Sequence, residues 1–124
     1  MDSTIQKWRT LVDRLTYYTS SRKIKWKDSA DSGVYITRIS GAQISLHESQ
    51  SDKHWDEMIY YIRIYNGSGE VVDAFSDEDI ASDDVNYFKI MKNLYRSIVR
   101  MNNGSEDVLD GILKELPDPD EIPF

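Results

Sequence analysis

The spacing of apolar residues predicts three helices, one at the start of the chain and two near its end. Over residues 3–19, apolar side chains recur every three or four positions, as on one face of an amphipathic helix, and Ser3 is a suitable N-cap. A second stripe predicts a helix from an N-cap at Ser82 to the NNG stop at 102–104. A third stripe predicts a short helix over 105–116, which the following proline ends.

Between these helices, alternating apolar and polar residues predict two β-hairpins. The segments VYITRIS and QISLHES are separated at Gly41-Ala42, and DEMIYYIRIYN and EVVDAFS are separated by an NGSG turn at 66–69. A further short strand is predicted at 24–27. Alternation does not assign the faces of the strand that begins at Val34. It does assign one face of the longest strand to the core: Met58, Tyr60, Ile62 and Ile64.

Together these elements predict an α+β fold. The hairpin loops are too short for parallel crossovers, so we expect an antiparallel meander of four to five strands. The N-terminal helix and the two C-terminal helices should pack on one face of this sheet. Residues 1–116 should form this single domain, and the Pro- and Asp-rich residues 117–124 an extended tail that is either mobile or lays Ile122 and Phe124 on a neighbouring surface.

Composition narrows the class of protein. The 124 residues are 40% hydrophobic and 30% charged, as in a soluble globular domain. Cysteine is absent, which excludes disulfides, thiolate zinc sites and cysteine nucleophiles and fits a reducing compartment. The first ten residues lack the pattern of a secretory signal, and no apolar run approaches the ~20 residues that cross a bilayer. We therefore expect a cytoplasmic protein without a membrane contact.

The net charge of −7 is unevenly distributed. Residues 1–38 carry a net charge of +4 and the remainder −11, so most of the chain would repel a phosphate backbone and nucleic acid is not an expected partner. The basic segment RKIKWK at 22–27 has two interpretations. Arg22, Lys23 and Lys25 can attract phosphate while Trp26 stacks on a base. The favoured interpretation is structural, with Ile24 and Trp26 facing the core and the lysines facing water on an edge strand.

Acidic side chains are concentrated before the second predicted helix. Asp77, Glu78 and Asp79 begin this stretch, which has no glycine at the position that a calcium-binding EF-hand loop requires. Helix capping and solvation are the favoured explanation of such acids, and the alternative is a surface complementary to a basic protein partner or a phosphate mimic directed at a nucleic-acid-binding protein. On the outward side of the sheet, Tyr61 and Arg63, with Tyr65, form a surface suited either to cross-strand pairing or to a second copy of the chain.

Other candidate sites are weaker. Lys89, Lys92, Arg96 and Arg100 form a basic stripe on the second predicted helix, which is typical of a solvated helix face. A metal or acid–base site can be drawn from five residues, His47, Glu48, Asp52, His54 and Asp56, but their spacing fits no helical ligand pair. Glycine-rich phosphate loops, HExxH and GxSxG are missing. We therefore expect no enzyme activity, no cofactor and no metal.

The layout of an amphipathic helix, a T..RKIKW edge, a tyrosine-rich meander and a closing YFKIMKNLYRSIVR helix resembles small α+β proteins of bacteria and mobile elements such as phages. This resemblance implies a prokaryotic or phage origin and carries no site residues with it. With the acidic surface, it leads us to expect a non-enzymatic protein that occludes a basic protein partner, as an immunity-type or anti-defence inhibitor does. The alternative is a small-ligand or nucleotide-binding module that uses the basic and aromatic segment at 22–26.

Overall fold

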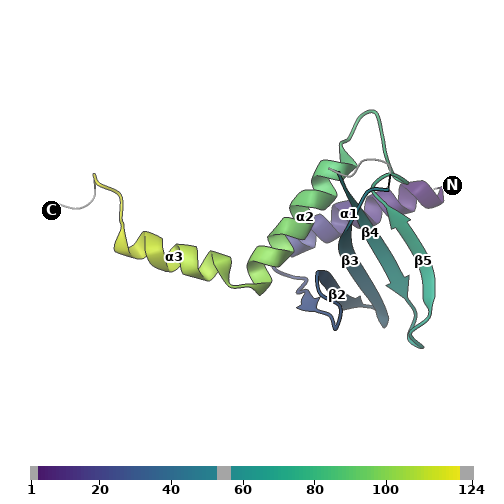
Figure 1. The fold of residues 1–124 in the computed structure, drawn as a ribbon, viewed down its shortest axis with the longest axis horizontal. Coiled ribbons are helices and arrows are strands. Elements are labelled where there is room, and N and C mark those ends of the chain that lie inside the picture. The colour runs from purple at the N-terminus through teal and green to yellow at the C-terminus, as the bar shows by residue number, and fades with distance from the viewer. Residues whose placement is uncertain (1–2, 53–56, 121–124) are drawn as a thin grey trace.

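The computed structural model describes residues 3–52 and 57–120 and shows an α+β architecture (Figure 1). The elements follow in the order α1 (Thr4–Ser20), β1 (Lys27–Asp28), β2 (Val34–Ile39), β3 (Ala42–Gln50), β4 (Met58–Tyr65), β5 (Val71–Ser76), α2 (Tyr87–Asn102) and α3 (Ser105–Glu115). All five strands form one antiparallel sheet in chain order, so the predicted meander with its three helices is confirmed. None of the helices in these ranges has both the length and the apolar character needed to span a membrane.

Two tight turns fix the register of the hairpins. Between β2 and β3, Ser40 and Gly41 have φ angles of 53° and 78°, and two-residue hairpin turns of this kind need positive φ at both positions. Between β4 and β5, the Asn66 side chain accepts hydrogen bonds from the backbone N–H groups of Ser68 and Glu70, each at 3.0 Å. The predicted NGSG turn is confirmed, and the first turn lies one residue earlier than Gly41-Ala42.

The register of the strands defines the core face of the sheet. Leu46, Ile62 and Phe75 lie opposite one another on β3, β4 and β5, and none is more than 2% exposed. Tyr60, two residues before Ile62, is 2% exposed, and Met58 and Ile64 pack against the same cluster. The predicted core face of β4 is therefore confirmed.

The same register assigns the faces of β2, which alternation left open. Tyr35 pairs with Leu46 and Thr37 pairs with Ile44, so Tyr35 and Thr37 face the helices. Thr37 is buried although it is polar, and its hydroxyl donates to the carbonyl of Lys25 at 2.9 Å. That hydrogen bond satisfies the polar atom in the core and ties the 22–26 segment to β2.

Two helices cover this face of the sheet. The buried hydrophobic residues of the helical layer come from α1 (Val12 and Leu15) and from α2 (Tyr87, Met91, Leu94, Tyr95 and Ile98). On α1, the Trp8 ring stacks on Phe75 with a centroid distance of 4.9 Å. Its indole N–H donates to Asp73 at 2.9 Å, so this strand acid stabilises the contact between α1 and β5.

The N-cap of helix α2 lies four residues later than predicted. The N-cap is Asn86, whose side chain accepts from the backbone N–H of Lys89 at 3.0 Å, and the prediction of Ser82 is wrong. Ser82 instead accepts from the N–H of Asp84 within a turn. The cause is Ile80, which is 0% exposed, because a residue anchored in the core at this point leaves 81–86 to connect the anchor to the helix.

Helix α3 extends away from the sheet (Figure 1). None of its residues is buried, and it is joined to α2 through a junction at Gly104, which has a φ of +77°. An ion pair of 2.6 Å between Arg100 on α2 and Glu106 on α3 crosses this junction. The packing of this helix differs from the prediction, in which both C-terminal helices cover the sheet.

The basic segment at 22–27 is irregular for most of its length. The strand predicted at 24–27 is wrong in extent, because β1 comprises only Lys27–Asp28. The predicted alternation of burial is present: Trp26 is 5% exposed and Ile24 is half-buried, whereas the lysines at 23, 25 and 27 are exposed. The indole N–H of Trp26 donates to the buried hydroxyl of Thr19 at 3.0 Å, which attaches the segment to the end of α1.

Replacing Trp26 with alanine should destabilise the fold. The substitution removes a buried ring and leaves the Thr19 hydroxyl without its donor, so we expect the free energy of unfolding to fall by roughly 3–5 kcal/mol. Urea unfolding followed by circular dichroism measures this change. The neighbouring exposed Lys25→Ala should change the free energy by less than about 0.5 kcal/mol. A Trp26→Ala protein as stable as the wild type would contradict the structural assignment of this residue.

Candidate functional site

The segment between β5 and α2 forms an acidic part of the described surface that also exposes apolar side chains. We call this surface the acidic platform and define it by six exposed residues: Glu78, Asp79, Asp83, Asp84, Val85 and Phe88. All of them except Asp79 line one shallow hollow, to which Ala81 and Asn86 also contribute. Val85 and Phe88 are each 37% exposed, so an apolar patch lies next to the carboxylates.

Contacts with α1 hold the backbone of the acidic platform in place. The Arg9 guanidinium donates to the carbonyl of Ile80 at 3.0 Å and to the carbonyl of Ala81 at 2.7 Å. The same guanidinium lies 5.9 Å from the centroid of the Tyr87 ring. With Ile80 fully buried, the segment is attached to the core from two sides, and its acids are displayed on a fixed backbone.

Two of the three acids predicted to contact a partner support the fold. Asp77 is 7% exposed, and its carboxylate accepts from the backbone N–H of Tyr60 at 2.8 Å, while its own N–H donates to the Tyr60 carbonyl at 3.0 Å. The Asp79 carboxylate accepts from the N–H of Ser76 at 2.8 Å, although Asp79 is exposed. Glu78 lies between them and is exposed.

Burial and hydrogen bonding act in opposite directions on the pKa of the Asp77 carboxyl. Desolvation raises the pKa of the Asp77 carboxyl above its ordinary 3.8, and the neighbouring Glu78 and Asp79 add to the increase. The hydrogen bonds from the N–H groups of Tyr60 and of Asp77 itself act in the opposite direction. Asp77 is therefore a structural acceptor at the end of β5, and the charge offered to a partner comes from the exposed acids.

Sequence reasoning missed the residues that position the acidic platform. Arg9 lies on α1, about seventy residues before its acceptors, so no local pattern links it to the loop. Ile80 gave a usable signal, because a single large aliphatic residue inside SDEDIASDD indicates a core anchor. Val85 and Phe88 both belong to the apolar stripe of the longer helix that was predicted from Ser82, but Val85 precedes α2, Phe88 lies in its first turn, and both are exposed.

The residues of the basic segment are divided between two hollows. Arg22, Lys25 and Trp26 line one at the base of α3, and Lys23 and Lys25 line another beside α1. Lys23 lies 5.9 Å from the centroid of the Tyr18 ring. Because Trp26 is buried and hydrogen-bonded to Thr19, its ring does not offer a face on which a nucleotide base can stack.

Tyr61, Arg63 and Tyr65 share the face of the sheet that points away from the helices. Tyr61 pairs with His47 across β3 and β4, and their rings stack with centroids 5.1 Å apart. Burial lowers the pKa of His47 below 6.5, and the positive charge of Arg63 lowers it further. This arrangement is a cross-strand aromatic pair beside an arginine, and Arg63 is the exposed member of the three predicted residues.

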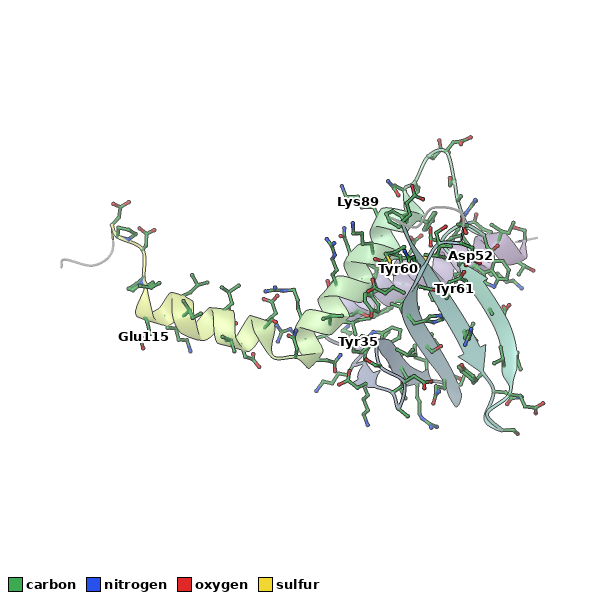
Figure 2. The ribbon with its side chains drawn as sticks, viewed as in Figure 1. Tyr35, Asp52, Tyr60, Tyr61, Lys89 and Glu115 are labelled. Carbon is green, nitrogen blue, oxygen red and sulfur yellow. The ribbon has the colours of Figure 1, made fainter. Side chains whose placement is uncertain are left out.

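A cluster of tyrosines lies between the sheet and α2. The Tyr95 ring is 5.6 Å from Tyr35 and 5.7 Å from Tyr60, and Figure 2 shows Tyr35 and Tyr60 beside α2. The Tyr95 hydroxyl donates to the Gly33 carbonyl at 2.8 Å, and the Tyr60 hydroxyl donates to Glu48 at 3.2 Å. Burial, followed by the charge of Glu48, raises the pKa of Tyr60 and of Tyr95 to about 12. Both phenols are therefore neutral and already hydrogen-bonded at neutral pH.

The basic stripe of α2 borders this tyrosine cluster. Lys92, Arg96 and Arg100 line the hollow above it, and Lys89 is exposed one turn before Lys92 (Figure 2). Of the five residues drawn as a metal or acid–base site, His54 and Asp56 lie outside the described residues. Within the two described ranges, no three histidine or acidic side chains are placed to hold a metal ion.

Comparison of the chain with protein-family models, with curated proteins and with solved structures finds no match.

Substitution of Asp77 separates its hydrogen bond from its charge. Asp77→Asn retains an acceptor for the Tyr60 N–H, whereas Asp77→Ala leaves that buried N–H unpaired, at a cost of about 1–3 kcal/mol. We expect Asp77→Ala to unfold at lower urea than the wild type and Asp77→Asn to be at least as stable as the wild type at pH 7. Equal losses in the two variants would contradict the role of Asp77 as an acceptor.

The lowered pKa of His47 predicts a specific pH dependence of stability. The unfolded chain binds a proton at His47 near pH 6.5, more readily than the folded chain does. The stability that neutral His47 contributes is therefore complete above pH 6.5 and is lost as the pH falls through the lowered folded value. His47→Gln should reduce the difference in unfolding free energy between pH 7.5 and pH 5.5, measured in urea. An unchanged difference would show that His47 titrates normally in the folded protein.

Proposed function

We propose that this chain is a non-enzymatic binding protein of a bacterium or phage that occludes a basic protein partner, in the manner of an immunity-type or anti-defence inhibitor. The observation that carries the proposal is the acidic platform, in which the exposed carboxylates of Glu78, Asp83 and Asp84 line the same hollow as the exposed side chains of Val85 and Phe88. Protein interfaces commonly combine an apolar centre with a charged rim. A partner surface with an apolar contact surrounded by lysine or arginine complements this arrangement.

The fixed backbone of the acidic platform supports this use. Ordering a flexible loop on binding costs conformational entropy, which reduces affinity. Here Arg9 and Ile80 order the segment in the free protein, so the cost is met during folding. An aspartate-rich loop without these contacts would be a poor inhibitor, because much of its interaction energy would be spent on ordering it.

The charge of the chain supports fast capture of a cationic partner. Within the described residues, the structure contains a single side-chain ion pair, Arg100–Glu106, so the platform acids Glu78, Asp83 and Asp84 are not neutralised by a described cation. Together with the net charge of −7, they produce a negative field over this end of the molecule. Such a field accelerates association with an oppositely charged protein and is screened by salt.

Two further observations favour binding of a protein over binding of a nucleotide or catalysis. The burial of Trp26 removes the stacking face on which the nucleotide alternative depended. In the tyrosine cluster, the raised pKa values of Tyr60 and Tyr95 keep their hydroxyls protonated, and both already donate to protein acceptors. These groups are suited to packing and not to proton transfer near neutral pH.

The proposal predicts that reversing the platform charges abolishes capture of the partner. Wild-type protein and a Glu78→Lys/Asp83→Lys/Asp84→Lys variant would be immobilised and exposed to lysate of the cells that make the protein, and the retained proteins identified by mass spectrometry. Calorimetry with the purified partner should then show a roughly 10- to 100-fold loss of affinity for the variant, and weaker binding by the wild type as salt rises.

The matched control reverses three exposed acids elsewhere, Asp31→Lys/Glu70→Lys/Asp120→Lys, and so produces the same change in net charge. The control should retain most of the affinity, because affinity depends on the position of the acids as well as on total charge. Equal losses in both variants, or a partner bound as tightly by the platform variant as by the wild type, would contradict the proposal.

A further inference from the structure

Helix α3 carries an apolar stripe that its own chain does not cover. The stripe contains five aliphatic side chains, each between 42% and 69% exposed: Val108, Leu109, Ile112, Leu113 and Leu116. Their spacing of one, three and four residues places them on a single face of the helix. Glu106 and Asp110 follow one edge of this stripe and Glu115 the other, so the apolar face has acidic borders.

An isolated helix of this length is not stable by itself. Helices shorter than about 12–15 residues are marginal in water, and α3 has eleven residues with none of them buried. Its described hydrogen bonds to the rest of the chain lie at its start, where Glu106 pairs with Arg100 and Ser105 bonds to Asn103. The end of the helix near Glu115 projects without a neighbouring element (Figure 2). A contact along the stripe would stabilise it.

A groove of matching character runs beside α1. Its apolar surface comes from Leu11 and Tyr18 on α1, from Ile24, and from Ile39 at the end of β2. Tyr18 and Ile39 are 39% and 38% exposed, which is high for large apolar residues. Because β1 pairs with β2 only as far as Ile36, the edge of β2 from Thr37 onward has no described strand beside it, and the groove is open along this edge.

The charges of the groove are opposite to those of α3. Four cations line it, Arg14, Lys23, Lys25 and Arg38, and no acidic residue does. An apolar floor with a basic rim therefore complements an apolar stripe with acidic borders. The hollow at the base of α3 differs, because Glu106 and Asp107 are among the residues that line it.

We propose that α3 of one chain lies in this groove of a second copy, which returns the same contact, so that the protein is a two-fold symmetric homodimer. Ile24 and Lys25 line both the groove and the hollow at the base of α3, so the arm and its receptor surface lie side by side on each chain. A surface that presents a helix next to the groove for that helix is self-complementary, which a two-fold dimer requires.

The α2–α3 junction favours a second copy over insertion of α3 into the groove of its own chain. Only Asn103 and Gly104 separate the two helices, and the Arg100–Glu106 ion pair and the hydrogen bond from Ser105 N–H to the Asn103 side chain keep α3 directed away from the sheet. Folding back would break these contacts, whereas pairing with a second copy retains them. Short connections of this kind promote exchange of an element between copies.

The mass of the protein in solution tests the dimer. Light scattering and sedimentation between about 1 and 200 µM should show the wild type approaching twice the 14.4 kDa chain mass. Leu113→Asp on α3 and Arg38→Glu in the groove should each raise the dimer dissociation constant by roughly 100-fold or more. Both residues are exposed, so circular dichroism should show that the fold is retained. Lys114→Asp, on the opposite side of α3, should remain dimeric.

Cysteine crosslinking tests which surfaces meet. The chain has no cysteine, so a mixture of two single-cysteine chains reports only contacts between molecules. Ile39→Cys in the groove should form a disulfide with Leu109→Cys, Leu113→Cys or Leu116→Cys on the stripe more efficiently than with Lys114→Cys. A monomeric wild type, a dimer unaffected by both Leu113→Asp and Arg38→Glu, or crosslinking that does not distinguish the faces of α3 would each overturn the proposal. These results are independent of the acidic platform, which contributes no residue to the groove.

Discussion

The width of the sheet limits how many helices can pack side by side on one of its faces. Strands lie about 4.8 Å apart, so the four full-length strands present a face roughly 20 Å wide. Packed helices lie about 8–10 Å apart, so α1 and α2 fill that face, and their buried residues meet Leu46, Ile62 and Phe75 there. The surface left uncovered on this side is the groove beside α1, lined by Thr37 and Ile39, and the α2–α3 junction directs α3 of the same chain away from it. The exposed stripe of α3 follows from this limit, because its apolar residues must be covered by something other than their own sheet.

The periodic spacing of apolar residues predicted most of the helices and strands, because each of them has one face that is apolar and packs, or is available to pack, against another surface. It did not assign the faces of β2, where apolar residues occur on both sides and only pairing with Leu46 and Ile44 shows that Tyr35 and Thr37 face inward. It also treated α3 like α2, since a stripe of Leu and Ile has the same pattern whether the surface that covers it belongs to the same chain or to another. Local pattern shows that a face needs a partner and does not identify the partner.

The acidic platform was predicted from composition only in part. Composition located the acids before α2, but it did not separate Asp77, which is buried against Tyr60, from Glu78, which faces solvent. That distinction depends on the end of β5, where the Asp77 side chain continues the hydrogen bonding of the strand. The position of the platform depends on Arg9, whose acceptors are distant in sequence and are backbone carbonyls, which carry no signature in the side-chain pattern.

The two proposals use surfaces at opposite ends of α2. The acidic platform precedes the helix and α3 follows it, and a 16-residue helix is about 24 Å long, so the two surfaces do not compete for space. Burial of the basic groove against an acidic helix would neutralise much of the positive charge of residues 1–38. The charge left on the dimer surface would then be dominated by acids, including two copies of the platform. Association of this kind would make a bipolar chain into a predominantly negative particle with two sites for a basic partner, which increases avidity for a partner that is itself repeated.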